Sequence, residues 1–239
     1  MKQYRQGLAA AISLLLSLAA GNTALAQKAG GILKMYNFDS PPSMSILEEA
    51  TQASQGPMMG VFNNLVMFDP HVKQNSLATI VPDLATGWTW NEDGTAVTLP
   101  LRQGVKWHDG KPFTAKDVQC TWDLILEKSA DKLRFNPRKS IYKNLDRVVA
   151  NGDYEVTFYL KRPQPAFLNL VAGGFSAIYP CHVAPAQMRQ HPIGTGPFKF
   201  VEFKPNESIK GRTRITGNPG GRISTASNTR SSRTQRRQC

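Results

Sequence analysis

Alternation of apolar and polar positions predicts two β-hairpins in the middle of the chain. Residues 88–90 and 97–101 alternate in this way and are joined by an Asn-Glu-Asp-Gly turn. A second pair of alternating runs, residues 146–150 and 153–160, is joined by Asn151 and Gly152. Asn-Gly is a strong hairpin signal because both residues of the tight turn need positive φ. The central part of the chain therefore indicates antiparallel sheet.

Apolar residues at helical spacing predict helices on either side of the first hairpin. Thr114 lies three residues before Asp117, which is the spacing of a capping box at a helix start. The inward face of that helix is formed by Val118, Trp122, Ile125 and Leu126. A second helical face, expected to pack in the core, comprises Met58, Met59, Phe62, Leu65 and Val66. A short helix is also expected after the prolines of residues 162–172.

Strands are expected near both ends of this region. Residues 32–36 form an apolar run that ends where two prolines follow Asp39 and Ser40. Residues 198–203 form another run, directly after the Gly-Thr-Gly-Pro turn of residues 194–197. Hairpins mixed with single helices predict an α+β fold rather than a series of βαβ units.

The first 26 residues have the pattern of a secretory signal peptide. Lys2 and Arg5 precede an apolar run at residues 8–20, and the small-x-small sequence of residues 24–26 precedes Gln27. The apolar run is shorter than the roughly 20 residues of a membrane-spanning helix. We therefore expect export to the periplasm and cleavage after Ala26.

The positive charge of the chain is concentrated at its end. Of the formal net charge of +12, residues 211–239 supply seven Arg with no Asp or Glu, and residues 27–210 supply only +3. The nearly neutral body, the export signal and the lack of aromatic residues in the tail argue against nucleic-acid binding. The tail has too few apolar residues to form a core, so we expect it to be disordered.

The sequence offers no catalytic or metal-binding constellation. The four His lack the spacing of a zinc site, and His108–Asp109 is expected in a solvated turn before Gly110. The Gly-Thr-Gly-Pro stretch is followed by a strand and lacks the Lys-Ser/Thr of a phosphate loop. A Cys120–Cys181 disulfide would suit an oxidising compartment, but the sequence alone leaves it open. We predict no enzyme activity and no cofactor.

The ordered set of stretches resembles the family 5 solute-binding proteins, the receptors of peptide, nickel and related ABC importers. The resemblance is carried by LATIVPDLATGWTWNEDGTAVTLPLRQGVKWHDGKPFTAKDV, with GGILKM, VFNNLVMFDP, AIYPCHV and PIGTGPFKF in the family's order. It implies a periplasmic-binding-protein-like fold whose two lobes close on a solute. Residues 27–210 would form the first lobe only, with an inserted subdomain at about residues 50–165.

The resemblance also implies a ligand and a partner. The ligand is a peptide or similar small solute, and an ABC permease is the membrane partner of the intact form, which acts as a monomer. Asn37, Phe38 and Asp39, together with Phe175 and Ser176, would face the cleft. The alternative is that Phe38 and Phe175 are core residues and Asp39 is a turn residue. Arg134 and Arg138 would meet an anionic solute or, alternatively, lie on the solvated surface.

Residues 211–239 depart from the family pattern, which continues with Asn-Pro-Asp-Tyr-Trp. When each codon is read one nucleotide earlier, the family pattern becomes possible. The shifted codon that spans Thr216 and Gly217 can then encode Trp, the one that spans Gly217 and Asn218 can encode Lys, and the one that spans Asn218 and Pro219 can encode Pro. We therefore expect that the reading frame is lost near Lys210 and that the product is truncated and impaired in binding. The alternative is an exported structural or interaction module whose basic tail contacts anionic partners. If deletion of residues 211–239 removes a binding activity, this alternative is supported and the interpretation of the tail as out-of-frame translation is wrong.

Overall fold

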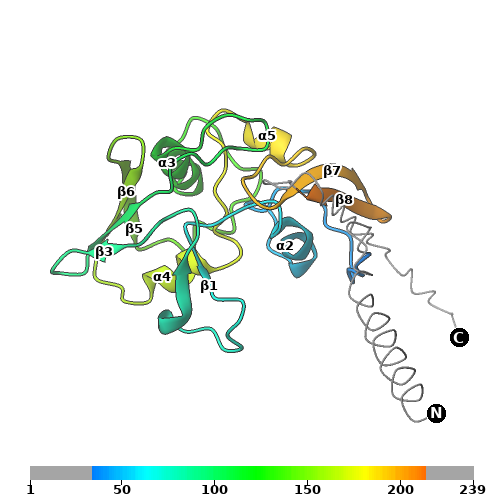
Figure 1. Cartoon of the computed structure of the whole chain (residues 1–239). Helices are drawn as coiled ribbons and strands as arrows, with labels where there is room; N and C mark the ends of the chain where they lie inside the picture. Colours follow the sequence, from blue (N-terminus) through cyan, green and yellow to red (C-terminus); the bar gives the residue numbers. More distant parts are fainter. Residues whose placement is uncertain (1–33, 214–239) are drawn as a thin grey trace, which may run out of the picture.

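The computed structural model describes residues 34–213, which form antiparallel sheets and short helices. The largest sheet lies at one end of the molecule, and the hairpin of β7 (Phe198–Lys204) and β8 (Ser208–Thr213) lies at the other (Figure 1). The predicted signal peptide, most of the predicted basic tail and Cys239 lie outside the described residues. None of the helices within residues 34–213 is long and apolar enough to cross a membrane.

The four-stranded sheet contains both predicted hairpins. Its strand order is β3-β4-β6-β5, and its members are β3 (Thr89–Trp90), β4 (Ala96–Pro100), β5 (Leu145–Ala150) and β6 (Glu155–Leu160). The second turn differs from the predicted two-residue form, because the Asn151 N–H donates to the Glu155 carbonyl at 2.9 Å and encloses a three-residue loop. Gly152 has a φ of 75° there. A longer loop needs positive φ at this glycine rather than at both residues of the turn.

Helix α3 (Ala115–Ile125) packs against this sheet as the apolar pattern predicts. Asp117 Oδ2 accepts the Thr114 N–H at 2.9 Å, which completes the predicted capping box. Val118, Trp122 and Ile125 are buried, and Trp122 meets Phe158 of β6 edge to face at 4.8 Å. The capped helix thus packs its apolar side chains against the sheet.

The predicted helical face at residues 58–66 is wrong beyond its first residue. Helix α2 (Gln52–Met58) ends at Met58, Met59 is 57 % exposed, and Val66 begins strand β1 (Val66–Phe68). The chain leaves the helix because Gly60 packs against Phe198 and because the Asn64 N–H donates to the Asp83 carboxylate at 3.0 Å. These long-range contacts override the local period. Phe62 and Leu65 are still buried, but from irregular backbone.

The predicted strand at residues 32–36 is not found at residues 34–36, and residues 32 and 33 lie outside the described range. Met35 and Tyr36 are 57 % and 68 % exposed. A strand forms only when a neighbouring strand takes up its backbone hydrogen bonds, and none of the described strands pairs with residues 34–36.

The remaining elements are short. Strand β2 (Ile80–Pro82) pairs with β1 and follows a 3₁₀ turn, η2 (Leu77–Thr79). Helix α4 (Phe167–Ala172) follows the prolines as predicted, and α5 (Pro185–Met188) begins at a proline. Residues 211–213 belong to β8 and not to a disordered tail, because their backbone pairs with β7.

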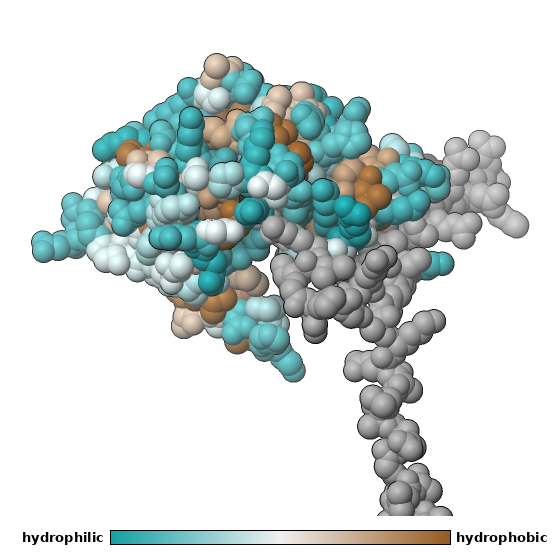
Figure 2. All heavy atoms as spheres, turned by 45° about the horizontal axis from the view of Figure 1, so that its top comes forward, coloured by the Kyte–Doolittle hydropathy of each residue, from teal (hydrophilic) through white to brown (hydrophobic). Residues whose placement is uncertain are grey.

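The face in Figure 2 is mostly hydrophilic, with hydrophobic side chains gathered at a few places.

Candidate functional site

The loop at residues 37–39 is tied to α2. Asn37 Nδ2 donates to the carbonyls of Asp39 at 3.1 Å and Ala53 at 3.0 Å. Asp39 Oδ1 accepts the Ser40 N–H at 2.8 Å, as expected of a turn residue. Phe38 is 61 % exposed, so the alternative that it is a core residue is wrong. The loop therefore presents an exposed aromatic ring on an anchored backbone.

The second candidate segment, residues 175 and 176, is more enclosed. Phe175 is half-buried, with the Arg138 guanidinium 4.1 Å from its ring centroid. Ser176 is 2 % exposed, and its hydroxyl donates to the Leu170 carbonyl at 2.6 Å and contacts the Tyr142 hydroxyl at 2.5 Å. Burial raises the pKa of Tyr142 to about 12, although the Ser176 contact acts in the opposite direction. Ser176 is thus a structural residue here and does not face a cleft.

Helix α2 brings the two candidate segments together. Asn37 binds it at the Ala53 carbonyl, and Gly174 lies against the Gln55 side chain. A Cβ at Gly174 would lie 2.1 Å from Gln55 Nε2, so this position has no room for a side chain without movement of Gln55. The predicted loop at residues 37–39 and Phe175 therefore flank the same short helix.

Arg138 is buried, which contradicts both expectations for it. It is 2 % exposed, and its Nη2 donates to the carbonyls of Ile46, at 2.9 Å, and Glu49. Burial lowers its pKa, while nearby Tyr142 and Tyr179 act to raise it. Backbone carbonyls and an aromatic ring are partners that a sequence pattern does not reveal.

Two buried carboxylates, Glu48 and Glu49, lie beside this arginine and were not identified from the sequence. Glu48 accepts hydrogen bonds from Arg189 at 2.7 and 2.9 Å and from the Arg134 N–H at 2.7 Å. Glu49 accepts one from the Ser43 hydroxyl at 2.6 Å and pairs with Arg134 at 3.4 Å. Burial acts to raise the pKa of Glu48, but its hydrogen bonds, led by that from Arg189, outweigh it and keep this pKa below its ordinary value.

A hollow of about 490 Å³, lined by both charged and apolar side chains, opens next to these carboxylates. Arg134 and Arg189 form part of its wall, with Ser43 and His191. The Arg134 side chain is 47 % exposed, so the prediction of a solvated surface position fits this residue in part. Pro42, which comes shortly after the candidate loop of residues 37–39 in the sequence, also lines the hollow.

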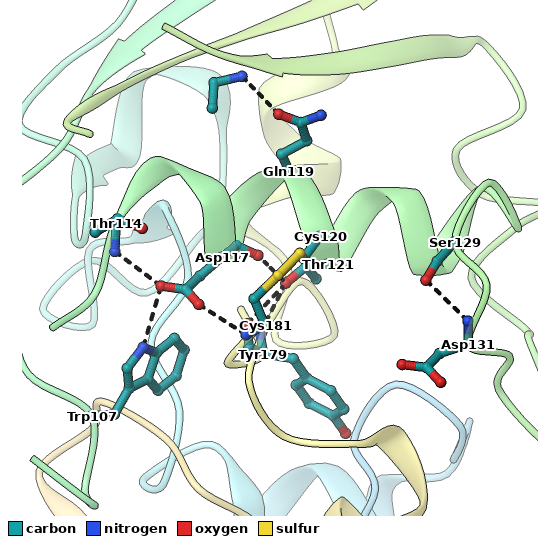
Figure 3. The surroundings of a disulfide bond; sticks show 11 residues. Trp107, Thr114, Asp117, Gln119, Cys120, Thr121, Ser129, Asp131, Tyr179 and Cys181 are labelled. Atoms are coloured by element: carbon teal, nitrogen blue, oxygen red, sulfur yellow. Dashed lines mark hydrogen bonds between the residues drawn. A yellow bond between two sulfur atoms is a disulfide. The ribbon is translucent and has the colours of Figure 1, made fainter. Parts of the chain in front are cut away.

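A disulfide between Cys120 and Cys181 joins α3 to the segment that follows Phe175 and Ser176 (Figure 3). Asp117 supports the same junction, because its carboxylate accepts the Cys181 N–H at 2.8 Å and the Trp107 Nε1–H at 3.3 Å. One turn further along α3, the Thr121 hydroxyl accepts the Tyr179 N–H at 3.0 Å. The Cys120–Cys181 disulfide, which the sequence alone left open, is thus present, and it holds the candidate segment against α3.

His108, Asp109 and Gly110 lie in a turn, as expected, and Asp109 and Gly110 are exposed. His108 is only half-exposed, because its ring contacts the Gly-Thr-Gly-Pro turn. His108 Nε2 meets the Gly196 carbonyl at 2.9 Å, and Nδ1 accepts the Gly194 N–H at 3.3 Å. Its neighbour Asp109 pairs with His182 at 2.6 Å. Burial acts to raise the pKa of Asp109, but the His182 hydrogen bond helps to hold it below its usual range. These contacts are structural, and no His, Cys, Asp or Glu cluster within residues 34–213 could hold a metal ion.

Comparison with known proteins identifies the family. The profile of the bacterial extracellular solute-binding proteins, family 5 (middle region), matches residues 79–214, more than half of the chain. The chain belongs to this family, as its sequence motifs predict. Membership places it in a class of solute receptors rather than enzymes, and the family is extracellular.

Two curated relatives are peptide-binding proteins by name. The oligopeptide-binding protein AppA of Bacillus subtilis is 32 % identical over 192 residues, which cover 76 % of this chain and 33 % of AppA. A probable di/tripeptide-binding protein of Pseudomonas aeruginosa is 27 % identical, covering 76 % of this chain and 38 % of that protein. The chain thus spans between a third and two fifths of the length of these relatives.

Solved structures confirm the periplasmic-binding-protein-like α+β fold. Bacillus subtilis AppA in complex with a nonapeptide superposes with a TM-score of 0.69 at 30 % identity, over 84 % of this chain and 40 % of that one. Helicobacter pylori DppA in complex with the peptide STSA gives a TM-score of 0.73 at 24 % identity, over 84 % and 43 %.

Proposed function

We propose that this chain is the first lobe of a receptor that delivers peptides or similar small solutes to an ABC permease. Its membership in the extracellular solute-binding family is the observation that carries the proposal. AppA, which shares both sequence and fold with the chain, holds a nonapeptide in its structure. The receptor acts in the periplasm as a monomer after removal of residues 1–26, and nucleic acid is not a partner.

The lobe contributes one wall of the solute site, formed by the loop at residues 37–39 together with Phe175. This assignment is supported by the exposed ring of Phe38 and by the anchoring of Asn37 on α2, the helix that Gly174 also contacts. An exposed aromatic ring on a fixed backbone offers contact area at low entropic cost. Asp39 adds a carboxylate that can receive a cationic group of the solute.

The inserted subdomain of about residues 50–165 corresponds in this account to the four-stranded sheet and α3. The sheet and α3 lie apart from the β7–β8 hairpin (Figure 1), whereas α2 and Gly60, at the start of this range, lie against that hairpin. In this proposal residues 211–239 are the translation product of a shifted frame that begins near Lys210, and the second lobe is encoded in the restored frame.

Sequencing the locus and measuring peptide binding tests the proposal. We expect the frame shifted by one nucleotide near codon 210 to continue into the rest of a receptor. The frame-restored mature protein should bind a panel of di- to nonapeptides with micromolar or tighter affinity in calorimetry. A non-coding continuation, or a restored protein that binds no peptide of the panel, would contradict it.

Variants of the restored protein test the wall itself. Phe38→Ala should weaken binding of a peptide about tenfold through loss of buried contact area. Tyr154→Ala, a truncation of another exposed ring in the β5–β6 loop, is the control and should leave affinity unchanged. Equal peptide affinities of the two variants would show that Phe38 is not part of the solute site.

A further inference from the structure

The segment between α3 and β5 carries a local excess of positive charge. Residues 132–143, here called the basic loop, contain five Lys or Arg and no Asp or Glu. Four of the five are exposed, namely Lys132, Arg134, Lys139 and Lys143. Residues 27–210 as a whole carry a net charge of only +3, so the loop is far more basic than the rest of the body.

The excess remains when the neighbouring acids are included. Residues 127–147 contain seven Lys or Arg against three Asp or Glu. The acids Glu127 and Glu49 pair with two of the cations of the loop. Lys161 adds a further cation at the end of the loop, because its Nζ donates to the Lys143 carbonyl at 2.8 Å. The basic loop therefore offers a surface with a net positive charge.

Two large apolar side chains are exposed within this basic surface. Phe135 is 67 % exposed, with the Arg134 guanidinium 5.7 Å from its ring centroid, and Ile141 is 42 % exposed. Apolar side chains set among cations are typical of segments that lie at an anionic membrane surface. There the apolar groups enter the boundary between headgroups and acyl chains, while the cations stay beside the lipid phosphates.

Contacts with the core hold the loop in place on both sides of the exposed ring. Before the ring, the Arg134 N–H donates to the Glu48 carboxylate at 2.7 Å. After it, Asn136 Nδ2 donates to the Ile125 carbonyl at the end of α3, at 2.8 Å. Because the backbone on either side is already fixed, docking through the ring needs little further ordering of the chain.

We propose that the basic loop docks this chain on an anionic phospholipid bilayer, with Phe135 and Ile141 entering the headgroup region. Charge complementarity selects this partner, because an anionic bilayer presents negative phosphates directly above an apolar interior. The inference goes beyond the proposed function, since it does not depend on which solute is bound.

The test must report on the loop alone, because residues 211–239 contain seven Arg and would attract anionic vesicles by themselves. Phe135→Cys is made in the mature chain, residues 27–239, together with Cys239→Ser, and carries a polarity-sensitive dye. Cys120 and Cys181 do not compete for the dye, since they form the disulfide. The matched control is Leu77→Cys, a labelled position that is 47 % exposed at the turn before β2.

Both labelled proteins are mixed with vesicles of phosphatidylglycerol and phosphatidylethanolamine in equal parts, and with vesicles of phosphatidylcholine alone. The dye at position 135 should shift its emission to shorter wavelength on the anionic vesicles only. The shift should largely vanish in about 1 M salt, where the screening length falls to about 3 Å. The dye at position 77 should keep its emission wavelength in every mixture.

A second pair of variants tests the charge without altering the ring. Lys143→Gln should weaken the affinity for the anionic vesicles about fivefold, which is the effect of one cation at an anionic surface. Lys73→Gln makes the same change of charge at an exposed residue outside the basic loop and should have a much smaller effect. Vesicle sedimentation measures both affinities.

Several outcomes would overturn the proposal. Equal shifts of the two dyes, or equal effects of the two Lys variants, would assign vesicle binding to the tail or to net charge. An equal shift on phosphatidylcholine would remove the role of the cations. A shift at position 135 produced by inorganic phosphate alone would assign the loop to a free anion. A shift produced by raising the protein concentration without vesicles would assign the loop to a second copy of this chain.

Discussion

Glu48 and Arg189, which are 141 residues apart in sequence, form a two-point ion pair with N–O distances of 2.7 and 2.9 Å. The Glu48 side chain is fully buried, and the Arg189 side chain keeps 27 % of its surface exposed. The pair joins the buried segment after the candidate loop to the segment that follows α5. It therefore fixes the start of the described chain against the part that leads into β7.

Glu48→Gln should destabilise the chain by about 3 kcal/mol near neutral pH, because it leaves a partly buried guanidinium without its counter-charge. Since the folded state lowers the pKa of Glu48 below its ordinary value of 4.5, the stabilisation is present above that pH. It is lost as the pH falls through the lower pKa of the folded state. Urea unfolding between pH 3 and 7 would measure the difference between the two proteins.

Glu92→Gln makes the same change of charge at an exposed turn residue and should alter the unfolding free energy by about 0.5 kcal/mol or less. The stabilising role of the Glu48–Arg189 ion pair is contradicted if Glu48→Gln changes the unfolding free energy equally little at neutral pH. It is also contradicted if the loss of unfolding free energy does not shrink on acidification.

Removal of the disulfide should lower stability by about 4 kcal/mol, because the bridge closes a loop between cysteines 61 positions apart. Cys120→Ser combined with Cys181→Ser should match the wild-type chain under dithiothreitol in chemical denaturation. Cys239→Ser removes the third cysteine, leaves the bridge intact and serves as the control. A double variant as stable as the oxidised wild type would show that the bridge does not hold the segment after Phe175.

Gly194→Ala should cost about 2 kcal/mol or more, because its Cβ would lie 1.9 Å from the Val61 carbonyl oxygen, a backbone atom that cannot move aside cheaply. Gly87→Ala adds the same methyl group where nothing lies within 4 Å and should be nearly neutral. Thermal melts of the two variants compare them directly. Similar melting temperatures would show that the close approach of the turn to residues 60 and 61 is not required.

Local signals predicted the elements whose hydrogen bonds close within a short stretch of chain. The capping box of Thr114 and Asp117 and the hairpins β3–β4 and β5–β6 are of this kind. The helical pattern after Met58 failed because contacts with Asp83 and Phe198, far along the chain, decide the backbone there.

The candidate site was predicted less completely than the sheet. The exposure of Phe38 and the anchoring of Asn37 are compatible with the predicted role. The burial of Ser176 depends on Tyr142 and Leu170, and that of Arg138 on the carbonyls of residues 46 and 49. A sequence does not reveal such partners, because they are set by packing between distant segments.

Calorimetry on the purified mature chain, residues 27–239, with di- to nonapeptides tests the central claim that this chain is one lobe of a two-lobed receptor. Affinity in such receptors comes from burial of the solute between both lobes, which excludes water on two sides. A single lobe should show marginal stability and no peptide binding in the micromolar range or tighter. Micromolar or tighter binding together with a two-state melt would contradict it, because a single lobe would then suffice as a receptor.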